Sequence, residues 1–255
     1  MEDEWMLNGD WRRSAWVELA SEMAAGLDQP LVVLAPIAPD ETVLSPWLTA
    51  AEWVRCARYR QAADRRRCVS AHALKRRVLS ALLGCAPHAL RFVCDAYGKP
   101  RLVANELAFN LSHAGDWVAL ACAPQGMGPI GVDLEQPSAR IADPVEIGVW
   151  HPEDRLLPAV SGEQAFYTAW TLKEAIAKGI GVGLGVGFET LALQACGDNR
   201  YQCHHQGRCW SARHHDVEGG VHLALACPRP WPRARWLQLE CSLAQTGALA
   251  VALPR

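Results

Sequence analysis

The sequence predicts a mixed α+β protein made of two similar lobes, each of which combines a long helix with short strands. Apolar residues recur with helical spacing over residues 47–83 and again over 163–178. Short apolar runs, separated by glycine, proline and other turn residues, lie next to each of these segments and are typical of strands. Half of the 255 residues are apolar, which is enough to bury the core of one large domain or two smaller ones.

The first half of the chain contains one of the two long helical segments. Residues 31–34, Leu-Val-Val-Leu, form a β-type run, whereas residues 1–30 give little information. Residues 47–83 predict one or two helices, and Gly84 is expected to end them. Further strands are expected at 91–94, 107–111, 117–123 and 130–135, with a turn at 97–100.

The second half also combines a long helix with short strands. Short helical segments are expected after Pro144, and a clear helix over 163–178 ends at Gly179. Residues 213–217 and 221–226 flank a Glu-Gly-Gly turn and predict a hairpin. A join near residues 124–129 divides the chain into an N-terminal lobe, 1–127, and a C-terminal lobe, 128–255.

The bulk composition excludes several classes of protein. The formal net charge is only −2, so the whole molecule is not a general electrostatic partner of nucleic acid or anionic lipid. The acidic start, Met-Glu-Asp-Glu, is unlike a secretory signal, and no apolar run approaches the roughly 20 residues that cross a bilayer. We therefore expect a cytoplasmic protein without a membrane partner, in which the ten cysteines are mostly reduced core residues.

One predicted strand carries two acids on the same face. In GVDLE, residues 131–135, apolar and acidic positions alternate, so Asp133 and Glu135 emerge on one side, roughly 7 Å apart. Such a carboxylate pair repels itself unless a cation or solvent screens it, and oxygen ligands of this kind suit Mg²⁺. The alternative is an ordinary strand with a solvated acidic face.

The helix over 163–178 carries a second group of polar residues. Trp170, Glu174 and Lys178 are spaced i, i+4, i+8 and share one face of that helix. Glu174 could complete a metal site or accept a proton, and Lys178 could meet a phosphate oxygen. The alternative is a common surface pair of Glu and Lys that contributes about 0.3–0.5 kcal/mol.

Taken together, these segments resemble a known family. GVDLE (131–135) and WTLKEAIAK (170–178), about forty residues apart, are similar to the two signature motifs of the 4′-phosphopantetheinyl transferases. YGKP (97–100) and FNLSHAGD (109–116) resemble stretches of the longer, surfactin-synthetase-activating (Sfp) type of that family. The glycine-rich loop 179–184 also resembles the segment that follows the family's catalytic helix.

The resemblance implies a fold and a reaction. The implied fold is two α/β lobes related by a pseudo-two-fold axis, with coenzyme A between them, acting as a monomer. The implied enzyme is a holo-[acyl-carrier-protein] synthase, which transfers 4′-phosphopantetheine from coenzyme A to a serine of an apo acyl or peptidyl carrier protein and releases adenosine 3′,5′-bisphosphate. The reaction depends on Mg²⁺, and coenzyme A is a substrate.

By position, the resemblance also implies the site residues. Asp133, Glu135 and Glu174 are the implied Mg²⁺ ligands, so the C-terminal lobe would carry the metal. The implied catalytic residues are Glu174, which takes the proton of the carrier serine, together with Lys178 and Asp133. The residues that resemble the family's coenzyme A-binding positions are Arg55, Arg67, Lys99, Ser112, His113, Lys173 and Lys178. A further family acid about twenty residues past Asp133 matches either Glu153 or Asp154.

The strongly basic stretch over residues 55–77 allows three interpretations. It holds nine arginines and lysines against the single acid Asp64. Without helix-turn-helix or zinc-finger spacing, or a set of stacking aromatic residues, it does not favour nucleic acid. A solvated helical face and a surface that binds phosphate or an acidic carrier both remain open.

Cysteines and histidines over residues 203–215 suggest a zinc site, but the segment lacks paired Cys-x-x-Cys knuckles and its pattern fits strands with exposed histidines equally well.

Two other functions remain as alternatives, namely a different Mg²⁺-dependent transferase that acts on a nucleotide diphosphate, and a carrier-binding protein without catalysis. The sequence does not identify the carrier, whether of fatty-acid, polyketide or nonribosomal-peptide synthesis, or the tolerance for acylated coenzyme A.

Overall fold

The protein is mixed α+β, as predicted, and its architecture comes from a computed structural model. The structure describes residues 6–10, 27–104, 107–137, 148–157, 162–217, 219–231 and 234–240. The strands of the first sheet, in spatial order, are β1 (Met6–Asp10), β12 (Arg235–Glu240), β2 (Leu31–Pro36), β6 (Trp117–Pro124) and β5 (Leu107–Ala114). Those of the second sheet are β7 (Gly131–Glu135), β11 (Val221–Cys227), β10 (Arg208–Val217), β9 (Arg200–His205) and β8 (Gln194–Gly197).

The remaining elements are helices, short turns of 3₁₀ helix and a small hairpin. The hairpin is β3 (Phe92–Cys94) with β4 (Pro100–Leu102). The α-helices are α2 (Ala50–Cys56), α3 (Ala62–Leu83) and α4 (Gly162–Ile180). The 3₁₀ turns are η1 (Glu41–Trp47), η2 (Pro87–Ala89), η3 (Gln125–Met127), η4 (Gly183–Val186) and η5 (Phe188–Thr190).

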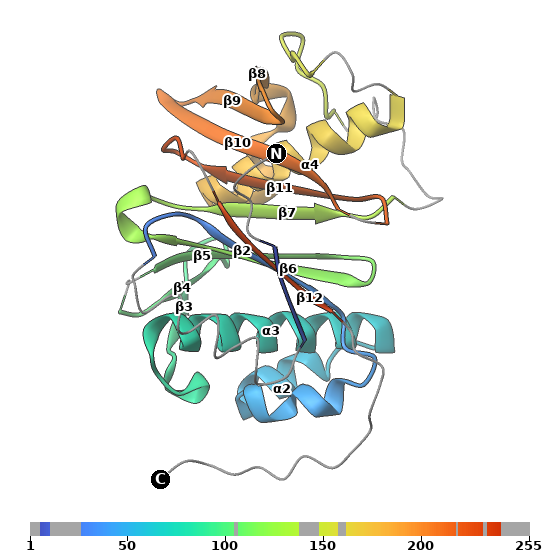
Figure 1. Cartoon of the computed structure of the whole chain (residues 1–255), viewed down its shortest axis with the longest axis vertical. Helices are drawn as coiled ribbons and strands as arrows, with labels where there is room; N and C mark the ends of the chain where they lie inside the picture. Colours follow the sequence, from blue (N-terminus) through green and yellow to red (C-terminus); the bar gives the residue numbers. More distant parts are fainter. Residues whose placement is uncertain are drawn as a thin grey trace.

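These elements form four layers, with α3 and α4 outside and the two sheets between them (Figure 1). The two sheets pack face to face through a core that includes Val32, Val132 and Leu223. Leu74 and Val78 of α3 pack against the outer face of the first sheet. On the far side, α4 packs against the outer face of the second sheet.

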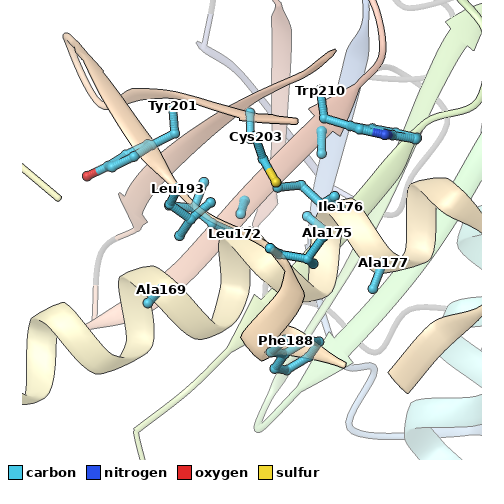
Figure 2. Close-up of a cluster of buried hydrophobic side chains, with 14 of the residues drawn as sticks. Ala169, Leu172, Ala175, Ile176, Ala177, Phe188, Leu193, Tyr201, Cys203 and Trp210 are labelled. Carbon is cyan, nitrogen blue, oxygen red and sulfur yellow. The ribbon is translucent and has the colours of Figure 1, made fainter. Parts of the chain in front are cut away.

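The packing of α4 is dense and apolar. Figure 2 shows Leu172 and Ile176 of α4 close to side chains of β9 and β10, among them Cys203 and Trp210. Leu172 and Ile176 are fully buried, and Trp210 exposes only 2% of its surface. Burial of several large apolar side chains at about 1.5–3 kcal/mol each fixes α4 on this sheet.

The helix ends follow local sequence signals. In α2, the Thr49 side chain accepts a hydrogen bond from the Glu52 N–H, and the Glu52 carboxylate accepts one from the Thr49 N–H, which together form a capping box. Helix α3 ends at Gly84, whose φ of +60° is left-handed, as the glycine at that position predicted. Helix α4 covers the predicted segment 163–178 with a short extension at each end.

Some elements differ from the expectations. The structure adds β1 and β4, and the described residues 148–157 contain no helix, while the rest of the helical region expected after Pro144 lies outside the described residues. Strand β12 pairs in parallel with β1 and β2, so it belongs to the first sheet although the expected boundary at residue 127 assigns it to the second lobe. Pairing between strands so far apart in the chain is not visible in local patterns.

The expectation of reduced cysteines is wrong for one pair. Cys56 at the end of α2 and Cys68 in α3 form a disulfide, with their Cα atoms 5.6 Å apart. The two cysteines are 12 residues apart, and the turn between α2 and α3 brings them together. None of the helices in the described part of the chain has the length and apolarity that crossing a membrane requires.

Candidate functional site

Two glycines allow α4 to lie directly on β7. A Cβ atom on Gly131 would be 1.8 Å from the carbonyl oxygen of Ala175 and 2.5 Å from the backbone nitrogen of Gly179. A Cβ atom on Gly179 would be 2.5 Å from the Trp210 ring. The two signature segments therefore meet because each supplies a position without a side chain.

The acidic strand and the polar face of α4 converge in the structure. The Lys178 ammonium donates to Asp133 Oδ1 at 2.5 Å and to Ser112 Oγ at 3.0 Å. Ser112 Oγ also lies 3.0 Å from Asp133 Oδ1 and donates to it. Because Ser112 is on β5, the cluster joins the edges of both sheets.

Side chains of β5 also complete the backbone hydrogen bonds of β7. The N–H of Val132 donates to Asn110 Oδ1 at 2.9 Å, and the N–H of Leu134 donates to Ser112 Oγ at 3.2 Å. These bonds satisfy backbone N–H groups of β7 at the edge of its sheet and fix the position of the acids on this strand.

Burial and mutual repulsion perturb two of the acids. The pKa of Glu135 rises to about 7 because of burial and the nearby Asp133 charge, although the Trp170 indole N–H, 3.0 Å from Glu135 Oε1, opposes the rise. Burial and Asp133 likewise raise the pKa of Glu174 to about 7. Burial would lower the pKa of Lys178, but the attraction of Asp133 outweighs it and the pKa is raised.

One oxygen of this cluster is left without a partner. Asp133 is 2% exposed, and its Oδ2 atom is buried with no hydrogen-bond partner among the described residues. The three acids do not form a compact cluster: within the described residues, the groups of ligand atoms within 4.8 Å of one another are Cys56, Cys68 and His72, and His214, Asp216 and His222. A buried carboxylate oxygen without a protein donor is free to ligate a cation or to accept a hydrogen bond from solvent.

A basic pocket of about 540 Å³ lies on the other side of β5. Ser112 and His113 are adjacent in a strand and point in opposite directions, so His113 faces this pocket while Ser112 faces the acids. Three of the expected coenzyme residues, Arg55, Arg67 and His113, meet there. The other lining residues are Arg58, Tyr59, Asp64, Cys68, Ala71, His72 and Leu111.

The sequence placed Arg58 only in the basic stretch and did not single out Tyr59 or His72. Arg58 and Tyr59 lie in the turn after α2, which local spacing does not place, whereas His72 follows Cys68 at i+4 in α3, and that spacing could have indicated it. The Arg67 guanidinium also donates to the Gly115 carbonyl at 3.2 Å, which connects α3 to the end of β5.

Lys99 lies outside the basic pocket. Its ammonium donates to the backbone carbonyls of Ile130 at 3.1 Å and Gly179 at 3.2 Å, and to that of Lys178. Burial lowers its pKa to about 8. In this arrangement Lys99 binds the C-terminal end of α4, where a cation stabilises unpaired carbonyls.

Lys173 does not face a coenzyme in the structure, and this expectation is corrected. Its side chain is fully buried, and its ammonium donates to Asp154 Oδ2 at 2.7 Å, to the Val149 carbonyl at 2.7 Å and to the Phe188 carbonyl at 3.2 Å. One position before Glu174, it projects from a different side of α4. Asp154 is therefore the partner of Lys173, and Glu153 is exposed.

The basic stretch over 55–77 is not one continuous surface. Lys75 Nζ lies 3.0 Å and Arg76 Nε 2.5 Å from the Glu52 carboxylate, and both basic side chains are about 5% exposed. Burial would raise the pKa of Glu52, but hydrogen bonds from His72 and Arg76 hold it well below its usual range. The interpretation as a solvated helical face is therefore wrong for this part of α3, while the N-terminal part lines the basic pocket.

Comparison with known proteins agrees with this geometry. A family model for the N-terminal part of 4′-phosphopantetheinyl transferases matches residues 35–125, and a model for the 4′-phosphopantetheinyl transferase superfamily matches residues 129–226. The chain is 28% identical to the Bacillus subtilis 4′-phosphopantetheinyl transferase ffp over 76% of this chain and 89% of that protein. It is 32% identical to the Nostoc transferase HetI over 62% of this chain and 67% of that protein.

Two observations define the class of protein. The two packed sheets carry a Ser-Asp-Glu-Lys site at their junction, and the family models match the sequence in both halves of the chain. The chain belongs to the 4′-phosphopantetheinyl transferase superfamily. Within it, the chain is of the Sfp type, and it is 27% identical to Sfp of Bacillus subtilis over 69% of this chain and 80% of that protein.

Proposed function

We propose that this transferase moves 4′-phosphopantetheine from coenzyme A to a serine of an apo acyl or peptidyl carrier protein. The observation that supports this most is that Asp133, which lies close enough to Glu135 and Glu174 to raise the pKa of both, has a buried oxygen without a hydrogen-bond partner among the described residues, with Lys178 beside it. Three acids against one ammonium leave excess negative charge in a site with little solvent.

The residues present fit a divalent cation of the Mg²⁺ type. The candidate metal ligands are all carboxylate oxygens, which such a hard cation prefers, and Asp133 Oδ2 has no hydrogen-bond partner among the described residues. Asp133, Glu135 and Glu174 would hold it. When bound, it supplies neutralising charge for the diphosphate of coenzyme A.

Glu174 would accept the proton released in the transfer, and Lys178 would stabilise the negative charge that develops. A carboxylate with a pKa near 7 accepts a proton efficiently at neutral pH, so Glu174 would take the proton of the carrier serine hydroxyl, directly or through water. The serine oxygen then forms a bond to the β-phosphorus, and the bond from that phosphorus to adenosine 3′,5′-bisphosphate breaks. Lys178 stays protonated and stabilises the developing negative charge.

The basic pocket would hold the nucleotide end of coenzyme A. Arg55, Arg67 and His113 line it, and guanidinium groups suit the 3′-phosphate because they donate paired hydrogen bonds. Ser112 lies between the pocket and the acids, on the strand that borders both.

The finer points of organisation belong to the same proposal. We infer two lobes, 1–127 and 128–255 apart from β12, which joins the sheet of the first lobe. We infer that they are related by a pseudo-two-fold axis, in a protein that acts as a cytoplasmic monomer. The matching position of α3 and α4 on the outside of two sheets supports that relation.

The test is intact-protein mass spectrometry of apo carriers incubated with the transferase, coenzyme A and Mg²⁺. The expected result is a gain of one phosphopantetheine on a carrier serine, lost with EDTA and absent from a carrier Ser→Ala variant. Fatty-acid, polyketide and peptide carriers are compared in parallel. Unmodified carriers in every case, with coenzyme A still bound, would refute the proposed acceptor.

A further inference from the structure

A second group of metal-type ligands lies outside the acidic site. His214 and Asp216 on β10 are two residues apart and so share a face, and Asp216 is paired in register with His222 on β11. His214 Nε2 is 3.1 Å from His222 Nδ1, while Asp216 Oδ1 is 3.5 Å from His222 Nδ1 and 4.0 Å from His214 Nε2.

These separations suit one shared ion. Zinc–nitrogen and zinc–oxygen bonds of about 2.0–2.2 Å in a tetrahedron place two ligand atoms about 3.3–3.6 Å apart, and never more than about 4.4 Å. The 3.5 Å separation lies in the tetrahedral range, and the 3.1 Å and 4.0 Å separations lie on either side of it and below the upper limit. A hydrogen bond between the two imidazoles explains the shortest distance alone, but it does not explain why the carboxylate oxygen faces both rings.

The surroundings hold the ligands in place. The His222 ring stacks on Tyr167 of α4, with ring centroids 5.1 Å apart. Gln164 Nε2 lies 3.4 Å from Asp216 Oδ2, the second oxygen of that carboxylate. Both histidine side chains are below 10% exposed, whereas Asp216 is half exposed, so the group is closed on the protein side and open on the solvent side.

The donor set selects a different cation from the one proposed at the acidic site. Two imidazole nitrogens and one carboxylate suit zinc and its transition-metal neighbours, whereas Mg²⁺ prefers oxygen alone. The other compact group, Cys56, Cys68 and His72, has its two sulfurs in a disulfide.

We propose that His214, Asp216 and His222 form a binding site for a zinc-type divalent transition-metal ion, with its fourth position open to solvent. The ion would join β10 to β11 at the end of the second sheet that faces the first turns of α4. It is independent of the proposed transfer reaction. Of the Cys/His-rich segment that suggested zinc in the sequence, only His214 takes part; Cys203 is buried in the α4 core and His204 is exposed.

The test is a titration of the whole, metal-stripped protein with Co²⁺ and Zn²⁺ in saturating Mg²⁺. Co²⁺ reports its coordination by visible absorption, and Zn²⁺ affinity is measured by competition with a chromophoric chelator. We expect one ion per chain with histidine-type coordination. His222→Ala should weaken binding by more than the roughly 10–100-fold that follows loss of an outer-shell partner.

Controls separate this site from others in the chain. Asp216→Asn, at a half-exposed position, should also weaken zinc binding. This variant tests the site if circular dichroism shows that His222→Ala is unfolded. His204→Ala, Cys68→Ser and Glu174→Gln should each keep wild-type affinity. The proposal is overturned if the wild type binds no Zn²⁺ in excess Mg²⁺, if Asp216→Asn binds as the wild type does, or if Glu174→Gln abolishes binding instead.

Discussion

Replacing Glu174 with glutamine should make the metal-free protein more stable at alkaline pH although it removes the proposed proton acceptor. The pKa of Glu174 is about 7 in the folded protein against an ordinary value of 4.5, because burial and Asp133 disfavour its charge. A carboxyl group with a raised folded-state pKa binds more protons when folded than when unfolded. Its contribution to stability is therefore lost as the pH rises from about 4.5 to 7.

The shift sets the size of the effect. A difference of about 2.5 pKa units at 1.36 kcal/mol per unit corresponds to about 3 kcal/mol above pH 7. Near pH 5 most of that penalty is absent, and the difference between wild type and Glu174→Gln should fall below about 1 kcal/mol. Histidines that titrate in the same range act equally in both proteins and cancel in the comparison.

The assay is urea unfolding in EDTA at about pH 5 and about pH 8, with Glu153→Gln as an exposed control. Glu174→Gln should exceed the wild type by about 3 kcal/mol at about pH 8, while Glu153→Gln should match it at both pH values. Mg²⁺ should reduce the gap by stabilising the wild type. Equal stability of Glu174→Gln and wild type at about pH 8 would show that burial and Asp133 do not disfavour the charge of Glu174 as the structure indicates.

Two further substitutions test the corrected and the expected coenzyme residues. Lys173→Ala leaves Asp154 buried without its cation and should lower the free energy of unfolding by about 3–5 kcal/mol. The KM for coenzyme A should be unchanged in the folded fraction, and a higher KM without destabilisation would restore a coenzyme role for Lys173. Arg67→Ala should raise the KM for coenzyme A by about 10–100-fold, because it removes a charged hydrogen bond of about 1.5–3 kcal/mol. The KM for 3′-dephospho-coenzyme A should be unchanged, and an equal rise for both substrates would place the 3′-phosphate elsewhere.

The sequence predicted those parts of the site that depend on the period of a single element. Alternation in β7 put Asp133 and Glu135 on one face, helical spacing put Glu174 and Lys178 on another, and the structure brings these faces together. The opposite directions of Ser112 and His113 follow from the same strand rule.

Contacts between distant segments could not be read in this way. The burial of Lys173 depends on Asp154 and on carbonyls of two other segments, and the role of Glu52 depends on side chains one helix away. The histidine pair across β10 and β11 also needs the strand register, which local patterns do not give. The sequence therefore shows where a charged residue stands but not which residue it pairs with.

The position of β12 has a consequence for how the protein is assembled during synthesis. This strand lies between β1 and β2 and pairs in parallel with both, so the first sheet has a gap until residues 235–240 leave the ribosome. Until then β2 keeps an open edge of unpaired backbone groups, which is the kind of edge that joins other chains. The N-terminal half is made first but completed last, and chaperones would meet it as an unfinished sheet throughout the synthesis of the second half.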